Sequence, residues 1–318
     1  MTLTRSGEHL KLIVGAAEAI AAGVRQLTLT APGGTPLPSY PPGSHLGLRV
    51  PGTRHVNSYS LTGDGDSPAE YTISVLRVPG GRGGSAWAHT LQPGDAVTAI
   101  RPRSGFTPVA TARRHLLVAG GIGITPLLAH ARWHVRRENE FTLYYVHKPG
   151  RPAHLEELRG ICGSRVYPFG RRNDLWTTLG PALARQPLGT QLYVCGPAGM
   201  ITAVTDAARA LHWPESRIRF EAFGVADEKP REPFRVAVPG RRVDVSAEET
   251  LLEALEREGL DVPNMCRQGV CGECRLPVSR GRADHRDLVL SAAERESGKW
   301  IMPCVSRADG DGELELRV

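Results

Sequence analysis

The first third of the chain alternates apolar and polar residues in short runs that are separated by Gly- and Pro-containing turns, such as Pro41-Pro42-Gly43. A period of two over four to eight residues is typical of half-buried β-strands. The runs that fit this pattern are Leu10–Val14, Val24–Thr30, His45–Val50, Ser58–Leu61, Tyr71–Val78 and Ala96–Ile100. Because many short strands must close to hide their edges, we predict an antiparallel β-barrel over residues 1–110.

From residue 111 to 225 the pattern changes to apolar strand runs that alternate with helical runs. Strands are predicted at His115–Ala119, Phe141–Val146, Arg165–Tyr167 and Gln191–Val194, and helices at Leu127–Arg137, His154–Leu158, Leu175–Leu179 and Gly199–Leu211. This alternation predicts an α/β domain with a parallel sheet, which binds ligands at the carboxyl ends of its strands. Two turns fall there, Gly120–Pro126 and Cys195-Gly196-Pro197. The first departs from the dinucleotide fingerprint but allows the same close backbone approach to a dinucleotide.

Residues 226–232 are polar, contain a proline and lack periodicity, so we predict a linker there. Beyond it, Phe234–Val238 and Arg242–Val245 predict a hairpin around Pro239-Gly240. Glu248–Glu258 predicts an amphipathic helix with three leucines on one face. Residues 233–318 therefore have the strand, helix and loop order of a small α+β ferredoxin domain of the β-grasp type.

Four cysteines give the C-terminal domain its chemistry: Cys266, Cys271, Cys274 and Cys304. The spacing C-x4-C-x2-C with a distant fourth cysteine is the plant-type [2Fe-2S] pattern. A structural zinc site prefers two CxxC-like pairs, and disulfides need an oxidising compartment. Two glycines inside the loop allow tight turns that bring backbone N–H groups to the sulfurs. The sequence therefore predicts a [2Fe-2S] cluster, which needs an electron donor and an acceptor.

The net charge of +6 is divided unevenly along the 318 residues. Residues 233–318 hold 13 Lys and Arg against 16 Asp and Glu, and residues 1–232 hold 26 against 17. The arginines are scattered without interleaved aromatic residues, so we expect no nucleic-acid binding; the acidic module either is simply solvated or recognises a basic patch on a redox partner. The apolar run Leu12–Val24 is too short to span a bilayer and contains Glu18. We therefore expect a cytoplasmic protein without a membrane segment.

Two stretches in the barrel region are candidates for binding a flat, phosphorylated cofactor. Asn57-Ser58-Tyr59-Ser60-Leu61 combines an aromatic ring with small hydroxyl side chains, which suits a heterocycle but also an ordinary half-buried strand. Gly80–Ser85 is glycine-rich and leads into Ala86–His89. A glycine-rich turn that opens a helix offers free N–H groups to a phosphate, although a flexible hairpin has the same composition.

The three modules in this order resemble the phthalate dioxygenase reductase family, the flavin and iron–sulfur reductase components that serve Rieske non-haem iron oxygenases. The matching segments are Tyr59-Ser60-Leu61, Gly120–Pro126, Cys195-Gly196-Pro197, Glu221–Gly224, Cys266–Cys304 and, within the last, Gly281–Asp287. The resemblance covers nearly the whole chain. It implies that electrons pass from NADH to FMN, to the [2Fe-2S] cluster and then to a terminal oxygenase component.

The resemblance also implies roles for individual residues. Tyr59 and Ser60 would contact the isoalloxazine, Ser74, Val75 and Leu76 would line its pyrimidine side, and Gly83, Gly84 and Ser85 would hold the FMN phosphate. Thr125 and Cys195 would flank the nicotinamide, and Phe223 would cover the flavin face until the nicotinamide displaces it. Gly121, Gly196 and Pro197, in the same two turns, are further cofactor-binding candidates. The family usually has Arg where this chain has Asn57, so either Arg54, Arg82 or the loop N–H groups neutralise the phosphate, or flavin binding is weaker. No general acid or nucleophile is required.

Alternatives remain open from the sequence. A reductase of the same build could serve a cytochrome P450 or a diiron monooxygenase, and a flavin and iron–sulfur redox sensor would carry the same motifs. Arg151, Arg171 and Arg172 could read the 2′-phosphate of NADPH, whereas Asp174 could accept a hydrogen bond from a ribose hydroxyl. The resemblance implies NADH, and we expect a monomer.

Overall fold

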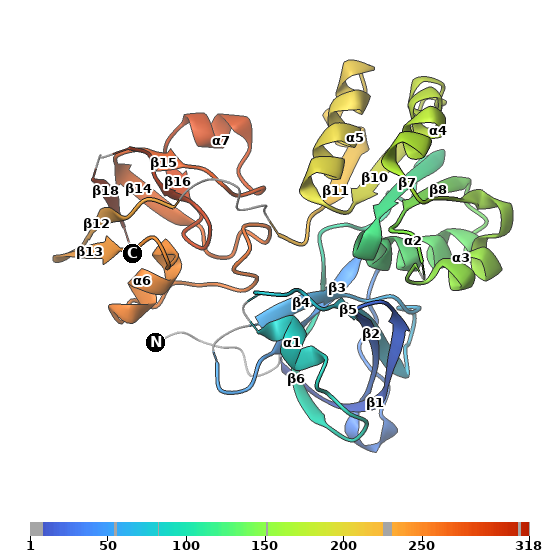
Figure 1. Ribbon diagram of the computed structural model, residues 1–318, viewed down its shortest axis with the longest axis horizontal. Coiled ribbons are helices and arrows are strands. Elements are labelled where there is room, and N and C mark those ends of the chain that lie inside the picture. The colour runs from blue at the N-terminus through green and yellow to red at the C-terminus, as the bar shows by residue number, and fades with distance from the viewer. Residues whose placement is uncertain are drawn as a thin grey trace. The chain divides into compact units, whose positions relative to one another are not determined.

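The computed structural model describes residues 9–53, 56–81, 83–150, 152–224, 231–310 and 313–317. The chain divides into two compact units, Met1–Glu221 and Ala222–Val318, whose ribbons are drawn in Figure 1. The first unit contains both the predicted barrel and the predicted α/β region. Most of the predicted linker, residues 226–230, lies outside the described residues. Within the described part of the chain, no helix has the length and apolar character that a bilayer span requires.

The barrel is confirmed. Its six antiparallel strands have the order β4-β3-β6-β1-β2-β5 and the bounds β1 (His9–Ala21), β2 (Val24–Thr30), β3 (Ser44–Arg49), β4 (Val56–Ser60), β5 (Glu70–Leu76) and β6 (Ala96–Ser104). A bridge between Leu61, just after β4, and Ile73 of β5 joins the two edge strands. The sheet closes around a core that includes Leu27, Leu46 and Tyr71. A short helix, α1 (Gly84–Ala88), follows β5.

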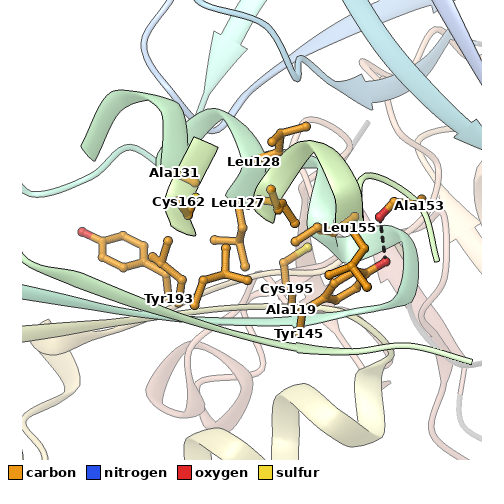
Figure 2. Packing of buried hydrophobic residues seen from close by; sticks show 14 of the residues in the cluster. Ala119, Leu127, Leu128, Ala131, Tyr145, Ala153, Leu155, Cys162, Tyr193 and Cys195 are labelled. Atoms are coloured by element: carbon orange, nitrogen blue, oxygen red, sulfur yellow. Dashed lines mark hydrogen bonds between the residues drawn. The ribbon is translucent and has the colours of Figure 1, made fainter. Parts of the chain in front are cut away.

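The α/β region is confirmed as a parallel sheet with the order β11-β10-β7-β8-β9. The strands are β7 (Arg114–Gly120), β8 (Phe141–Val146), β9 (Val166–Phe169), β10 (Thr190–Cys195) and β11 (Ile218–Glu221), and the helices are α2 (Ile124–Arg136), α3 (Leu155–Cys162), α4 (Arg172–Ala184) and α5 (Ala198–Ala210). Figure 2 shows how Tyr145 and Tyr193 of the sheet pack beneath Leu127 and Leu128 of α2.

Two local predictions in this region were wrong, and one strand was missed. Helix α2 begins at Ile124 rather than at Leu127, because a proline is tolerated in a first helical turn, so Thr125 and Pro126 are helical and not part of a turn. His154 is not the first residue of α3 but a left-handed residue that precedes it. Strand β11 was not predicted, because its four residues Ile-Arg-Phe-Glu are too few to show a period.

The second unit has the predicted ferredoxin-like fold. Its sheet has the order β13-β12-β18-β14-β16, with β12 (Phe234–Val238), β13 (Arg241–Val245), β14 (Leu276–Arg280), β16 (Trp300–Ile301) and β18 (Leu314–Leu316); β15 (Ala283–Asp284) pairs with β17 (Arg307–Ala308). Helix α6 (Leu251–Arg257) begins three residues later than predicted, because Thr250 and Glu253 form a capping box that starts the helix. A second short helix, α7 (Ala292–Glu296), precedes β16.

Candidate cofactor and electron-transfer sites

The four predicted cluster ligands lie in one region of the second unit as two pairs. The sulfurs of Cys274 and Cys304 are 3.3 Å apart, and the side chains of Cys266 and Cys271 hydrogen-bond to each other. Among the described residues, no three His, Cys, Asp or Glu side chains converge on a single metal position. Two thiolate pairs fit a binuclear cluster with one pair for each iron, and they fit a single tetrahedral zinc ion poorly.

The backbone of the loop is shaped by residues in the left-handed region. Gly269 has φ +72°, and a Cβ there would lie 2.7 Å from Val305 Cγ2, so only glycine fits without a shift. Arg267 adopts φ 53° and is 4% exposed. It pairs with Glu256 of α6 and donates through Nε to Asn264 Oδ1 at 2.9 Å. Helix α6 therefore anchors the loop beside the first ligand.

The electrostatics of the loop favour a thiolate at the first ligand. The pKa of Cys266 falls to about 6 because the Cys271 thiol and then backbone N–H groups hydrogen-bond to its sulfur, against the opposing effect of burial. One of these donors is Gln268 N, 3.3 Å from Cys266 Sγ. Thiolates are the form that binds metal. Cys271 is half-buried, whereas the other three ligands are buried, which leaves its edge of the site nearest to solvent.

Strand β4 carries polar atoms that lack partners. Ser58 Oγ and Ser60 Oγ are buried and have no hydrogen-bond partner among the described residues. Burial raises the pKa of Tyr59 to about 12, with a small opposing effect from Asn57. Because buried hydroxyls without partners are costly, such neighbours on one strand indicate that a ligand supplies the missing hydrogen bonds. These residues fit a flavin along β4.

The predicted phosphate-binding residues lie together. Gly83 has φ +86° and caps α1, and a Cβ on Gly84 would lie 1.2 Å from Asn57 Nδ2, so the Asn57 amide of β4 packs directly on the start of α1. The Ser85 hydroxyl accepts a hydrogen bond from Val78 N at 3.1 Å and so closes the loop on itself. Arg54 and Arg82, the predicted sources of positive charge, lie outside the described residues.

The three predicted pyrimidine-side residues differ in what they present. Val75 is buried in the barrel core, and its carbonyl oxygen lies 2.9 Å from His89 Nε2. Leu76 is exposed, and Ser74 is buried with its hydroxyl against His154 of the α/β region. Ser74 is therefore the one of the three whose side chain has a polar contact outside the barrel.

The two predicted nicotinamide turns meet at the carboxyl ends of β7 and β10. A Cβ on Gly123 would lie 2.3 Å from the Cys195 carbonyl oxygen, and one on Gly196 would lie 3.0 Å from Gly120 Cα, so the turns pack backbone against backbone. Thr125 donates from Oγ1 to the Ile122 carbonyl oxygen at 2.9 Å. Cys195 is fully buried within the apolar cluster of Figure 2. Its side chain therefore has a packing role as well as its predicted place beside the nicotinamide.

The remaining members of this end of the sheet have different surroundings. Gly121 has φ +54° and is exposed, and Pro197 caps α5. Phe223 is 37% exposed and lies just past the division between the two units, so its role over the flavin stays a prediction.

Glu221 is a site residue that the sequence reasoning missed. It ends β11 opposite Cys195, and its Oε2 atom is buried with no hydrogen-bond partner in the described part of the chain, although the residue as a whole is partly exposed. Burial raises the pKa of Glu221 to about 8, so the carboxyl group holds a proton at neutral pH. The available signal was the Glu221–Gly224 segment, which matched the family although no role was assigned to its first residue.

Known proteins resemble this chain along its whole length. The heme-dependent oxidative N-demethylase beta subunit of Ectopseudomonas mendocina is 40% identical over 95% of this chain and 96% of its own. The phthalate dioxygenase reductase of Burkholderia cepacia is 36% identical over 97% of each chain. A solved structure of phthalate dioxygenase reductase, described as modular for electron transfer from pyridine nucleotides to [2Fe-2S], superposes with a TM-score of 0.81 at 34% identity and 100% coverage of both chains.

The chain belongs to the phthalate dioxygenase reductase family. Residues 97–218 of this reductase match the N-terminal domain of dimethylamine monooxygenase subunit DmmA-like proteins, and residues 234–309 match the 2Fe-2S iron-sulfur cluster binding domain. The reductase is thus an electron-transfer oxidoreductase component of an oxygenase system, as the sequence predicted.

Proposed function

We propose that this reductase accepts a hydride from NADH onto FMN and passes the electrons singly through its [2Fe-2S] cluster to a terminal oxygenase component. The proposal depends on a site in each unit. In the second unit four cysteines lie as two pairs, and in the first unit two glycine-containing turns meet at the ends of strands. FMN supplies the step from two-electron to one-electron chemistry when bound. The protein supplies binding and orientation.

Strand β4 and the loop before α1 would bind the flavin. Ser58 and Ser60 offer hydroxyls without partners, and Asn57 with Gly83 and Gly84 offers an amide and backbone N–H groups. A short loop of this kind suits a single terminal phosphate, which favours FMN over FAD. Because Asn57 carries no charge, N–H groups must do more of the phosphate binding than an arginine would allow.

The strand ends of β7, β10 and β11 would bind the nicotinamide. Gly123 lets the first turn approach Cys195 closely, and Thr125 lies in the first turn of α2. Glu221 holds its proton beside Cys195 and so presents a neutral hydrogen-bond donor rather than an anion. Hydride transfer converts the neutral reduced nicotinamide into a positively charged ring. A neutral pocket stabilises that charge less than an anionic one would, so it favours release of the oxidised nucleotide.

The terminal oxygenase component has two candidate classes. The resemblance to phthalate dioxygenase reductase favours a Rieske non-haem iron oxygenase. The 40% identical relative is the beta subunit of a heme-dependent oxidative N-demethylase, which favours a haem-containing amine oxygenase. Reconstitution with one purified partner of each class, scored as substrate-dependent NADH oxidation, separates them.

An anaerobic NADH titration tests the electron path. Flavin and cluster absorbance should both bleach within seconds, cytochrome c should be reduced, and mass spectrometry of the released flavin should find FMN. A sensor would bind flavin without turnover, and FAD would contradict our assignment of the phosphate loop. A colourless, zinc-containing protein would contradict the cluster.

We further propose that the reductase is a cytoplasmic monomer. Support for a reducing compartment comes from Cys162 and Cys195, the two cysteines outside the cluster, which form no disulfide. Light scattering of the purified protein measures the mass directly, and a mass near twice 34.4 kDa would contradict the monomer.

A further inference from the structure

His154 is a buried histidine that the proposed electron path leaves without a task. It precedes α3, is 8% exposed and has φ 60° and ψ 9°. Side chains with a Cβ adopt this left-handed conformation at a cost that glycine avoids. Histidine occupies this position nevertheless, and the contacts of its ring suggest a role.

Both ring nitrogens of His154 have partners. Nδ1 lies 2.6 Å from Glu157 Oε2, and Nε2 lies 2.9 Å from Ser74 Oγ. Arg132 donates to the other carboxyl oxygen of Glu157 and, through Nε, to the Thr62 carbonyl oxygen at 3.1 Å. The four side chains of Arg132, Glu157, His154 and Ser74 form one line of hydrogen bonds from α2 through α3 to barrel strand β5.

Ser74 directs its hydroxyl out of the barrel. Its neighbours Ile73 and Val75 belong to the barrel core, and successive residues of a strand point to opposite faces. The residue is 4% exposed on this outer face, with His154 against it. This hydroxyl lies beside the pyrimidine half of the flavin only if the proposed function is correct, so the inference rests on that proposal.

Glu157 fixes the proton on Nδ1 of His154. The other carboxyl oxygen of Glu157 accepts from the Arg132 guanidinium, which favours the carboxylate form. A carboxylate can only accept, so Nδ1 must carry a hydrogen. Nε2 of a neutral ring then has only a lone pair. In this neutral form the Ser74 hydroxyl donates its hydrogen to Nε2, and its oxygen lone pairs are left for a ligand.

We propose that His154 is a positioning residue for the flavin: by holding the Ser74 hydrogen, it sets the hydrogen-bond polarity that β5 presents to the pyrimidine half of the ring. In this arrangement Ser74 can accept from a ring N–H but cannot donate to a ring carbonyl. Reduction adds negative charge to that half of a flavin, and a donor there would stabilise it. Because Ser74 cannot donate a hydrogen bond there, the reduction potential of the flavin is lower, which favours electron transfer from the flavin to the cluster.

A double-mutant cycle tests this route of action. H154L frees the Ser74 hydroxyl to donate, so the equilibrium between flavin and a reference dye should shift toward reduced flavin by about tenfold, which is about 30 mV for a two-electron couple. The same H154L change in the S74A background should give no shift. H212L is the matched control, because His212 also has φ 60° but is exposed at the end of α5.

The outcomes separate this proposal from the function on which it rests. The role of His154 would be overturned by any of four results for the flavin potential: equal shifts in both backgrounds, no shift, a fall, or the same shift in H212L. Flavin bound to the protein in these experiments would still support the proposed function. A wild-type protein without flavin would overturn both. If H154L does not fold, E157Q serves instead: the new amide can donate to Nδ1, Nε2 can then carry the hydrogen and donate to Ser74, and the same tenfold rise is expected. No rise in E157Q would likewise overturn the proposal.

Discussion

Cys195 and the cluster loop place cysteines in opposite environments. Cys195 ends a central strand inside an apolar cluster, where burial and then the nearby Glu221 raise its pKa well above the usual range. Cys266 sits in a loop whose neighbouring thiol and backbone N–H groups lower its pKa. Both sulfurs are buried, so burial does not distinguish them.

The difference teaches that hydrogen bonds donated to a buried sulfur, and not burial itself, decide whether its pKa falls, as at Cys266, or rises, as at Cys195. At Cys266 the first donor is the Cys271 thiol, whose own pKa is raised, and backbone N–H groups of a loop with Gly269 and Gly272 in the left-handed region add to it. Strand β10 commits its N–H groups to its neighbours in the sheet and has none to offer a sulfur. The loop favours the charged thiolate at Cys266, whereas the end of β10 keeps the Cys195 thiol neutral.

The largest effect should come from removing a cluster ligand. C271S should abolish cytochrome c reduction but leave ferricyanide reduction by NADH intact, because the cluster lies after the flavin in the path. C162S is the matched control, since Cys162 is a buried free cysteine of the first unit, and it should keep both activities. Joint loss of both activities in C271S would show that flavin and cluster do not act in series.

The second largest effect should come from a substitution that adds a side-chain atom where the two turns beside Cys195 pack together. In G123A the new Cβ would lie 2.3 Å from the Cys195 carbonyl oxygen, so the turns must separate at a cost of about 1–3 kcal/mol. We expect kcat/KM for NADH with ferricyanide to fall by roughly tenfold or more. G180A, in α4 with no atom near its Cβ, should have little effect. Unchanged kinetics in G123A would mean that the turn does not touch the nucleotide.

Glu221 should make stability depend on pH. Its pKa is raised from 4.5 to about 8 by burial, so the folded state keeps a proton that the unfolded state has lost. Stability should therefore fall as pH rises from about 4.5 to 8, by at most about 1.4 kcal/mol per pH unit, and level off above. Urea unfolding of the first unit at pH 6 and pH 8 should show a smaller loss in E221Q than in the wild type. Equal losses would contradict a protonated Glu221.

The smallest expected effect is the difference between NADH and NADPH as electron donors. We predict that NADH is preferred over NADPH by about tenfold in kcat/KM, or roughly 1.4 kcal/mol. Arg171 and Arg172 are exposed where α4 begins after β9, with Asp174 in the first turn. Steady-state kinetics with both nucleotides decides the matter. An equal or better value for NADPH would show that these arginines bind the 2′-phosphate.

The parts of the fold that the sequence predicted well are those set by local patterns. The bounds of β2, β8 and β12 agree with the predictions because turn residues end each apolar run. Helix starts were less predictable, since capping by Thr250 moved α6 and a tolerated proline moved α2. The contact of Ser74 with His154 spans 80 residues, and no periodicity encodes it. The cluster loop was predictable because its first three ligands lie within nine residues.

The division of the chain after Glu221 has a kinetic consequence. Glu221, which lies opposite Cys195 at the proposed nicotinamide site, is also the last residue of its unit, and the acceptor unit continues from it on the same polypeptide. A tethered donor and acceptor meet at an effective concentration that the connecting segment sets, not at the concentration of the enzyme. Electron transfer from flavin to cluster is therefore a first-order event, whereas delivery to the oxygenase component depends on encounter and slows on dilution.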